Sequence, residues 1–558
     1  MRPVSRPSRL SDCPRSPPSK TRALRHEIDF AYSGDQAAGA ESGHEEDSMR
    51  CTLGVDVGTS STKGVLAAED GTIIASATRA HDVSRPRSGW VEMDAAIWWE
   101  EFVAISRELL AAHPDTVIVG VGVSGMGPCI LLADEDDEPV RPAILYGVDT
   151  RSTAQIERLT RELGVAEITR VGGSTLTSQA GGPKIAWVAE EEPEAWKRAR
   201  RLYMPASWLA RKLTGAYVLD HQSASQVSPF YDIENERWHA PFWEQYAPTI
   251  ERPALAWAGE VAGAVTTEAA ELTGIPSGTP VITGTIDAWT EAVSVGAHEV
   301  GDLMLMYGTT MFLVATGEDT LRTPSMWTTA GAFPGTRNLA GGLSTSGALT
   351  AWLRDLTDAD YPQLLAEAEA AGPGARGLLV LPYFAGERTP IQDPDARGVI
   401  AGLTLQHGRG DLYRAALEAT ALGVRHNVET MRAAGADIRR IVAVGGGTQG
   451  RLWLQVVSDV TGLVQEVPQT TIGASYGAAF LAATAIAAPG AAPAITDWNP
   501  IAERIQPDAE LRPLYDALFD RYVRLYEGSK SVIHELAAAQ RDTPTTTANP
   551  THTAPEAS

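Results

Sequence analysis

An apolar stretch with strand-like alternation, Leu53–Val57, is interrupted by Gly58. Four small hydroxylated residues, Thr59–Thr62, come next, and Lys63 then leads into a second apolar run. Glycine lets the backbone turn where a side chain would clash. The pattern therefore predicts a β-hairpin over residues 53–66, with hydroxyls and unpaired backbone N–H groups gathered at its turn.

The same order of apolar and polar positions returns about 250 residues later, in residues 302–316. There Gly308 and the pair Thr309-Thr310 separate two apolar strands. A repeated unit of this kind indicates a duplicated architecture. We therefore expect two related domains that hold one nucleotide between their hairpins.

Apolar residues at helical spacing predict several helices between and after these hairpins. The clearest lie at residues 95–112, 185–204, 207–215 and 411–435. Two further stretches combine a strand, a turn of small residues and a helix. They are residues 280–297, whose turn holds Asp287, and residues 438–462, whose turn is a triple glycine. Residues 474–495 are expected to form a buried helix with a loop behind it.

The order of these elements indicates the fold class. A hairpin, a third strand over residues 72–78, a helix and a buried strand over residues 117–126 follow the order of an RNase H-like half-domain. We predict an α/β fold of two such domains, as in actin-like ATPases, with a cleft between them. The first domain is expected at residues 49–298 and the second at residues 299–537.

Both ends of the chain differ in composition from the rest. Residues 1–48 are rich in Arg and Pro and then acidic, so they cannot bury enough apolar surface to offset the entropy of ordering. We expect either a disordered extension or a segment upstream of a true first residue at Met49. Residues 538–558 form a polar tail that is predicted to be disordered.

Charge and composition narrow the range of partners. The 558 residues carry a formal net charge of −24, which does not suit a duplex nucleic acid or an anionic membrane surface. The most apolar stretch is too interrupted to span a bilayer. Three scattered cysteines indicate a reducing compartment. We therefore predict a cytoplasmic protein with no nucleic-acid or membrane partner, and we leave open whether it forms a homodimer.

Asp56 lies on the strand directly before the first turn. The N–H groups and hydroxyls of the turn suit phosphate oxygens. Phosphates would repel this carboxylate unless a divalent cation lay between them. The hairpin therefore predicts a site for ATP and Mg²⁺, with Asp56 as the metal-binding residue. An ordinary glycine-containing hairpin with an acidic strand residue is the alternative interpretation.

Taken together, the motifs resemble those of the FGGY carbohydrate kinases, the family of glycerol kinase, xylulokinase and ribulokinase. The resemblance runs from Met49 to about residue 535. It rests on GVDVGTSSTKGVL (54–66), VSGM (123–126), GTIDAW (284–289), DLMLMYGTT (302–310), RGVIAGLTLQHGRGDLYRAALE (397–418) and GGGTQGRLWLQVVSD (445–459). It implies ATP-dependent phosphorylation of a hydroxyl group on a small sugar or polyol.

The resemblance also assigns roles to individual residues. Asp287 stands where the family places its general base, although an aspartate there would also suit a helix cap. Asp56 matches the aspartate that orients Mg²⁺. The nucleotide is expected to contact Gly58, Thr59, Ser60, Ser61, Thr62 and Lys63 at the first turn, Gly308, Thr309 and Thr310 at the second, and Gly446, Gly447 and Thr448 at an adenosine turn.

The substrate loop departs from the patterns known in the family. It reads SGMGP over residues 124–128, so it lacks both the Met-His pair of xylulokinases and the Arg-Glu pair of glycerol kinase. We expect Met126, Gly127 and Asp287 to line the substrate. With neither pair present, fewer side-chain hydrogen bonds and more apolar wall would hold it.

Charged residues of two neighbouring loops are further candidates. Asp149 and Arg151 stand where xylulokinases have an Asn-Asp-Gln-Arg run, and they are expected either to bind substrate hydroxyls or to form an ion pair at a helix start. Trp90 and Glu92 match a family pattern that would pack the loop or contact the substrate. Asp220 resembles an acidic family position, but a structural role is expected for it.

The primary hypothesis is therefore phosphorylation of a ketopentose such as D-xylulose. Because the substrate loop has lost the known pairs, a tetritol, glycerol, a hexulose or ribulose also stays open as the substrate. An actin-like or Hsp70-like ATPase that acts as a binding module is the alternative from another class. Such a module would share the phosphate hairpins but not the acidic base in GTIDAW or the segment at residues 397–418.

Overall fold

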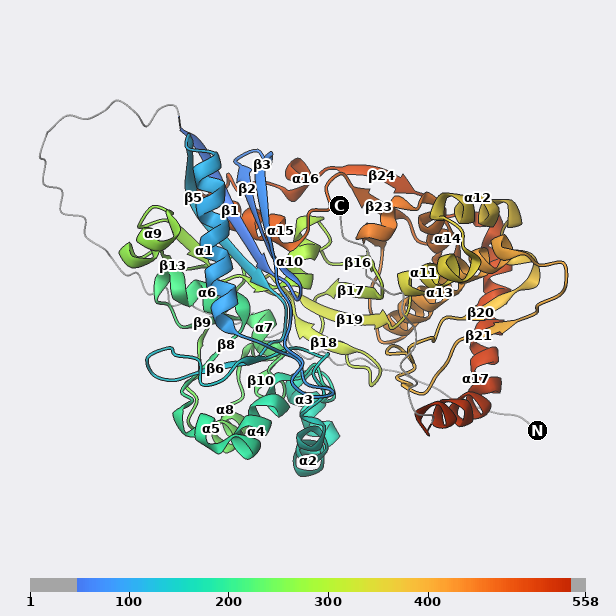
Figure 1. The fold of residues 1–558 in the computed structure, drawn as a ribbon, viewed down its shortest axis with the longest axis horizontal. Helices are drawn as coiled ribbons and strands as arrows, with labels where there is room; N and C mark the ends of the chain where they lie inside the picture. Colours follow the sequence, from blue (N-terminus) through green and yellow to red (C-terminus); the bar gives the residue numbers. More distant parts are fainter. Residues whose placement is uncertain (1–47, 543–558) are drawn as a thin grey trace, which may run out of the picture. The chain divides into compact units, whose positions relative to one another are not determined.

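Two seven-stranded mixed sheets form the framework of residues 48–542, the part of the chain that the computed structural model describes (Figure 1). The first sheet has the order β13-β14-β5-β1-β2-β3, and β15 also pairs with β5. Its strands are β1 (Met49–Val57), β2 (Ser61–Ala68), β3 (Ile73–Ala80), β5 (Thr116–Gly125), β13 (Val261–Ala264), β14 (Pro280–Ile282) and β15 (Thr285–Ile286). The expectations for residues 1–47 and 543–558 lie outside the described residues.

The second sheet repeats the plan of the first. It contains β16 (Asp302–Tyr307), β17 (Met311–Gly317), β18 (Trp327–Ala330), β19 (Arg337–Leu343), β22 (Arg440–Val444), β23 (Gln465–Pro468) and β24 (Ile501–Ile505), in the order β18-β19-β17-β16-β22-β23-β24. In both sheets a hairpin has an antiparallel third strand on one side, and two parallel strands with an antiparallel edge strand on the other. This repeated order confirms the predicted pair of RNase H-like domains.

Helices and short strand pairs surround the two sheets. The helices are α1 (Ala95–Ala112), α2 (Thr153–Leu163), α3 (Val165–Gly172), α4 (Gly181–Glu191), α5 (Pro193–Arg198), α6 (Pro205–Thr214), α7 (His221–Ser225), α8 (Ala240–Tyr246), α9 (Thr267–Thr273), α10 (Asp287–Ser294), α11 (Gly347–Thr357), α12 (Tyr361–Ala371), α13 (Arg409–Ala433), α14 (Arg451–Thr461), α15 (Ala474–Ile486), α16 (Ile495–Trp498) and α17 (Arg512–Asp542). The short pairs are β4 (Glu92–Met93) with β7 (Ala143–Ile144), β6 (Leu131–Ala133) with β8 (Arg201–Tyr203), β9 (Val218–Asp220) with β12 (Ala254–Ala256), β10 (Tyr231–Asp232) with β11 (Arg237–Trp238), and β20 (Leu379–Leu381) with β21 (Val399–Ala401). Across residues 48–542 no helix is both long and apolar enough to cross a membrane.

Most of the predicted helices are present, and their ends follow local chemistry. Helix α1 has the predicted bounds and begins after Asp94, whose side chain accepts a hydrogen bond from Ala96 N. Helix α6 ends at Gly215, which takes the left-handed conformation that glycine tolerates best. Helices α13 and α15 also lie where apolar spacing placed them.

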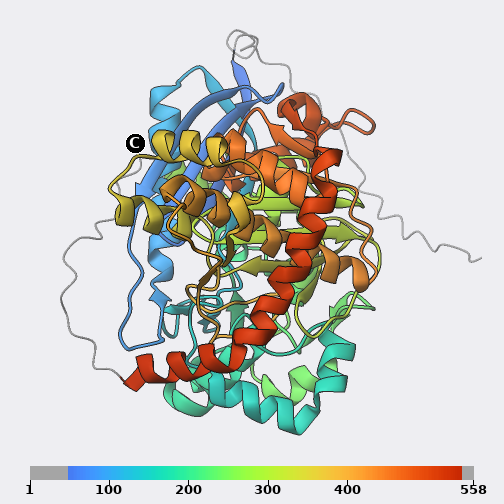
Figure 2. The ribbon, with the colours of Figure 1, turned by 90° about the vertical axis from the view of Figure 1, so that its right-hand side faces the viewer.

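The single helix predicted at residues 185–204 is wrong. The chain forms α4 and α5 instead, because Pro193 disfavours a helical conformation for Glu192, which has φ −127° and ψ 63°. Residues 201–203 then pair with β6 as strand β8. The predicted tail also starts too early, since α17 continues through residues 538–542. Figure 2 shows this long helix, which packs through Tyr515, Leu518 and Tyr522 on the core that also contains α13.

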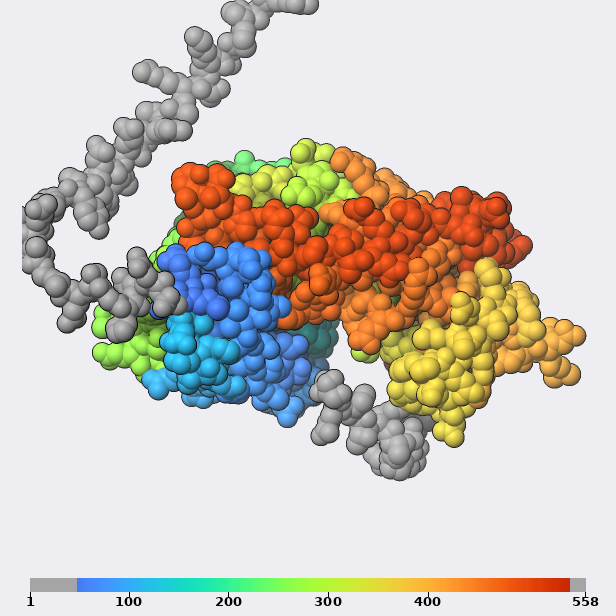
Figure 3. All heavy atoms as spheres, turned by 90° about the horizontal axis from the view of Figure 1, so that it is seen from above, coloured from blue at the N-terminus to red at the C-terminus, as the bar shows by residue number. Residues whose placement is uncertain are grey.

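Each sheet is covered on one face by a helix that follows a strand of the other sheet along the chain. Helix α15 follows the second sheet's strand β23 along the chain, but it packs on β1 and β5 of the first sheet. Helix α10 follows β15 of the first sheet, but its Trp289 and Ala292 share a core with Met304 and Val442 of the second. The two helices also contact each other. Figure 3 shows the blue strands of the first sheet directly against the orange-red segment that contains α15.

Glycines allow this close approach. A Cβ atom at Gly54 of β1 would overlap the carbonyl oxygen of Ser475, and one at Gly122 of β5 would overlap that of Ala478. A Cβ atom at Gly477 of α15 would overlap the carbonyl oxygen of Thr290 in α10. The helix backbone therefore rests directly on the sheet and on its partner helix, with no room for a side chain between them.

We predict that Gly54→Ala lowers the free energy of unfolding by about 3 kcal/mol, because the added methyl group must push α15 off the sheet. Chemical denaturation of the purified protein measures this value. Gly317→Ala is the matched control, since Gly317 also lies in a strand but has open space around its Cβ position. Equal stability of the two variants would contradict the close-packing interpretation.

Candidate active site

The first hairpin turn presents backbone N–H groups without partners. One backbone hydrogen bond closes the turn: Gly58 N donates to Ser61 O at 3.0 Å. Within residues 48–542 the N–H groups of Thr59 and Ser60 make no hydrogen bond. The hydroxyls of Thr59 and Tyr146 lie 3.0 Å apart. The turn therefore offers free donors at its tip, as a phosphate-binding loop requires.

The second turn has the same construction. Gly308 N donates to Thr310 O at 3.1 Å, and the turn is exposed. The N–H groups of Thr309 and Thr310 find no partner anywhere in the described ranges. The second turn thus also offers free donors at its tip, although its closing hydrogen bond spans one residue fewer than in the first turn.

The pairing of β1 with β2 decides which side chains share a face. Asp56 lies directly opposite Lys63, so both side chains are on the face that α15 covers. Ser61, two residues before Lys63, shares that face. Thr62 lies opposite Val57 on the other face, where its hydroxyl is buried and has no partner. The hydroxyl of Thr62 therefore lies away from Asp56, which differs from the expectation that it lines the phosphates.

Asp287 is the first residue of α10, one position after the cap residue Ile286. Strand β15 brings it to the hairpin, because Thr285 and Ile286 pair with Ser124 and Gly125 of β5. Strand β5 in turn pairs with β1. The side chain of Asp287 accepts a hydrogen bond from Ala288 N at 2.8 Å. Asp287 does not act as the helix cap, and it lies at the same sheet edge as Asp56.

Three carboxylates, from Asp56, Asp287 and Glu291, influence one another at this edge. Glu291 follows Asp287 by four residues, so both lie on one face of α10. Burial and then the charge of Asp287 raise the pKa of Asp56, while Lys63 acts in the opposite direction. Burial also raises the pKa of Asp287. Burial and the charge of Asp287 raise the pKa of Glu291 to about 7.

Asp56 also has an unsatisfied atom. Its Oδ1 is buried and has no hydrogen-bond partner within residues 48–542. A buried carboxylate oxygen without a partner is costly unless an ion or water meets it. No set of three His, Cys, Asp or Glu side chains in the described chain is arranged to hold a metal alone. These donors fit Mg²⁺, which usually takes one or two carboxylates together with substrate phosphates and waters.

The triple glycine forms a tight turn next to the second hairpin. Gly445 has a φ of 91°, and Gly446–Gln449 form a short 3-10 helix. A Cβ atom at Gly445 would collide with the backbone of Tyr307, the residue before Gly308. Gly446 is exposed with open space around it, and Thr448 Oγ1 donates to Gly445 O at 2.8 Å. The structure therefore brings the turn of Gly446, Gly447 and Thr448 next to the second hairpin.

The substrate loop lies against the residue before Asp287. A Cβ atom at Gly127 would lie 2.5 Å from the side chain of Ile286. Met126 N donates to Val57 O at 2.8 Å, and the side chain of Met126 is fully buried. The loop and Asp287 are thus neighbours, but the Met126 side chain belongs to the core of the first domain.

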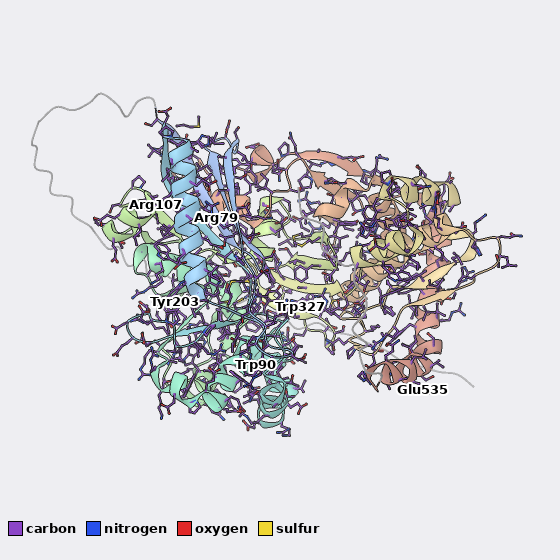
Figure 4. All side chains as sticks on the ribbon, viewed as in Figure 1. Arg79, Trp90, Arg107, Tyr203, Trp327 and Glu535 are labelled. Carbon is purple, nitrogen blue, oxygen red and sulfur yellow. The ribbon has the colours of Figure 1, made fainter. Side chains whose placement is uncertain are left out.

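Asp149 and Arg151 form an ion pair whose side chains are both fully buried. Asp149 Oδ2 also accepts a hydrogen bond from Val91 N at 2.6 Å, and Arg151 Nη1 donates to Glu92 Oε1 at 2.6 Å. The guanidinium of Arg151 lies 4.2 Å from the ring centre of Trp90, which Figure 4 labels. The ion pair predicted as the alternative to substrate binding is therefore present. It joins the loop of Asp149 and Arg151 to the loop of Trp90.

Several polar residues near the site were not found from the sequence. Glu291 carried a usable signal, because a carboxylate four residues after Asp287 must share its helix face. Tyr146 and Lys184 carried none. Lys184 is fully buried, and it donates to the carbonyl oxygen of Ser178. Asp220 has the structural role expected for it, since it caps α7 and accepts from Thr285 Oγ1 at 2.7 Å.

Comparison with known proteins now adds to this geometry. Residues 51–294 match the profile of the FGGY family of carbohydrate kinases, N-terminal domain, and residues 303–486 match that of its C-terminal domain. A two-domain α/β fold with these matches defines a phosphotransferase that acts on carbohydrates. The chain belongs to the FGGY family of carbohydrate kinases. Membership implies ATP as the phosphoryl donor and a small sugar as the acceptor.

Individual relatives agree with this assignment. Xylulose kinase of Escherichia coli is 29% identical over 482 residues, which cover 85% of this chain and 98% of the relative. The crystal structure of xylulose kinase from Rhodospirillum rubrum has a TM-score of 0.81 at 30% identity, covering 87% of this chain and all of that one. Gluconokinase of Bacillus subtilis is 25% identical over 508 residues, which cover 88% of this chain and 98% of the relative.

We predict that Glu291→Gln stabilises the protein at neutral pH by about 2 kcal/mol in the absence of divalent cations. The pKa of Glu291 is raised in the folded state from 4.5 to about 7, so folding takes up a proton in that range. Stability from this group is therefore present at low pH and is lost as pH rises through about 7. Thermal unfolding across this range should show a larger loss in the wild type than in the variant, because burial also raises the pKa values of Asp56 and Asp287, which titrate in both proteins. If the stability of both proteins falls equally with rising pH, the raised pKa of Glu291 is contradicted.

Proposed function

We propose that this chain transfers the γ-phosphoryl group of ATP to a hydroxyl of a small ketose or polyol, with a ketopentose such as D-xylulose as the first candidate. The observation that carries the proposal is that Asp287 lies at the edge of the first sheet, beside the first free-donor turn. The helix that Asp287 begins also reaches the second hairpin, because the ring centres of Trp289 and Phe312 lie 6.3 Å apart. Xylulose kinases among the relatives support the choice of sugar. The gluconokinase among them keeps other polyols open.

Asp287 acts as the general base in this proposal. Its carboxylate takes the proton from the attacking hydroxyl, and its buried position keeps it basic enough for that task. Asp56, with its unpartnered Oδ1, would hold Mg²⁺, which when bound neutralises charge on the phosphates. The free N–H groups of the first and second turns hold the phosphate oxygens from opposite sides. Positioning and electrostatic stabilisation then supply most of the acceleration.

The substrate side of the site is defined mainly by backbone and apolar groups. Gly127 packs closely against Ile286, and the side chain of Met126 is buried in the core. The Asp149–Arg151 pair is already saturated by its own partners, so in this proposal it orders the loop that carries Tyr146 and does not touch the sugar. Figure 3 shows a hollow between the blue strands of the first sheet and the yellow segment with α11 and α12. Closure of such a cleft would exclude water from the transferred group.

We predict that Asp287→Ala lowers kcat by about 10³-fold while the affinity for ADP stays unchanged. The carboxylate acts on the sugar hydroxyl and not on the nucleotide, so its loss should separate the two measurements. Steady-state kinetics and calorimetric ADP binding provide them. Asp82→Ala, at an exposed aspartate outside the site, is the control. A variant with near wild-type kcat would overturn Asp287 as the base.

We predict that a coupled ADP-release assay over pentuloses, hexuloses, tetritols and glycerol shows stimulation by a ketopentose first. The same assay without any sugar measures the ATPase background. Mass spectrometry of the product then identifies the phosphorylated sugar. If no sugar stimulates turnover above the background, the proposal fails and the chain is better explained as an actin-like or Hsp70-like ATPase module.

A further inference from the structure

A buried histidine lies directly behind the first phosphate turn. His81 is the residue after strand β3, and 5% of its side chain is exposed. Its backbone N–H donates to Ser60 O at 3.0 Å, and its ring Nε2 lies 3.0 Å from Gly58 O. His81 thus contacts two carbonyl groups of the first hairpin turn. Neither the family motifs nor the proposed function gives His81 a role there.

The other ring nitrogen faces a carboxylate. His81 Nδ1 lies 2.9 Å from Glu101 Oε2, and Glu101 is on α1. Both partners of the ring, a carbonyl oxygen and a carboxylate oxygen, accept hydrogen bonds and do not donate them. A neutral imidazole has one N–H and would leave one of the two contacts repulsive. An imidazolium, with a proton on each nitrogen, satisfies both acceptors at once.

The position of this ring fixes the direction of a phosphate-binding donor. The Gly58 carbonyl and the Thr59 N–H belong to one trans peptide group, so they point in opposite directions. Because the carbonyl points at His81, the N–H of Thr59 points away from it. That N–H is one of the free donors of the turn within residues 48–542. A charged donor on the carbonyl also polarises the peptide and strengthens its N–H as a donor.

We propose that His81 is a positioning residue for the nucleotide phosphates, acting as an imidazolium held between Glu101 and the Gly58 carbonyl. The inference rests on the proposed function, because it takes the first turn as a phosphate site. Glu101 fixes the charge and the orientation of the ring, and the ring orients the Thr59 N–H.

Helix α1 covers the face of the sheet opposite to the carboxylates Asp56 and Glu291. Figure 4 labels Arg79, two residues before His81, beside this helix. A positive charge at this place lies behind the turn in a chain whose net charge is −24.

Two substitutions separate the charge from the hydrogen bonds. His81→Phe removes both contacts, and we expect it to weaken ADP binding and raise the KM for ATP about tenfold, which corresponds to about 1.4 kcal/mol. Glu101→Gln keeps a partner for Nδ1 but lets the ring become neutral, so an intermediate loss of about threefold is expected. Binding of AMP, which has no β- or γ-phosphate, should be unchanged in both variants. Glu100→Gln is the matched control, because it removes the same charge from an exposed neighbour on α1.

The protonation state can be observed directly in the full-length protein. Selective ¹⁵N labelling of the 11 histidines, with His81→Gln to assign the signal, distinguishes an imidazolium from either neutral tautomer. We expect the imidazolium pattern for His81 at neutral pH in the wild type and a neutral pattern in Glu101→Gln. A purely structural role would lower thermal stability without changing the ratio of ADP to AMP affinity.

A neutral His81 in the wild type, or unchanged ADP affinity in folded His81→Phe, would overturn the inference. If His81→Phe does not fold, the same two measurements on Glu101→Gln decide. The outcome is separable from the proposed function. If His81→Phe loses ADP affinity and the wild type phosphorylates no sugar, the kinase proposal is refuted and the role of His81 stands.

Discussion

Direct backbone contact between helix α15 and the first sheet is the constraint on which the rest of the structure depends. Gly54 and Gly122 leave no side chain under the helix, and Gly477 leaves none between α15 and α10. Helix α15 therefore packs on the first sheet although it follows a strand of the second. Helix α10 packs on the second sheet although it follows a strand of the first. The first sheet, the second sheet and the two crossing helices become one packed unit, and the hairpin turns emerge beside the start of α10. Interiors at this packing density transmit displacement and do not absorb it. A movement of either domain is then also a movement of its hairpin turn.

In the proposed function, the site concentrates negative charge at the place where the nucleotide phosphates would bring more of it. Asp56, Asp287 and Glu291 lie together at this site, and burial raises the pKa of each. The charge of Asp287 raises the pKa values of Asp56 and Glu291 further. Such an arrangement costs stability in the empty protein and favours a divalent cation, which removes the repulsion when it arrives. In the same proposal, the free N–H groups at both turns would provide the remaining attraction for the phosphates. A strongly acidic chain can hold a nucleotide in this way because the donors act at contact distance, where the distant charges are screened.

Much of this arrangement was readable from the sequence, and the limits have physical reasons. The strand, Gly, hydroxyl and strand pattern is local, so both hairpins and the helix after Asp287 were predicted with correct type. The faces of the hairpin were not predicted correctly. Thr62 lies on the buried face because it pairs with Val57, and this register depends on the whole sheet. Pro193 was a visible break in the predicted helix at residues 185–204, but the pairing of residues 201–203 with β6 was not visible. Asp149 and Arg151 looked equally suited to a substrate or to each other. Only their burial with Val91, Glu92 and Trp90 distinguishes these roles.

Contacts between distant elements explain why the supporting residues of the site escape sequence patterns. His81 and Glu101 are 20 residues apart, on a strand end and a helix, and neither lies in a motif. Their relation to Gly58 exists because α1 lies along the sheet and because β3 ends beside the turn. Phosphate turns are recognisable from glycine and hydroxyl spacing, since that chemistry is contained in the turn itself. The direction of each N–H group is set from outside the turn, by whatever holds the carbonyl on its other side. A motif therefore locates a phosphate site, whereas the packing around it decides how well the donors are aimed.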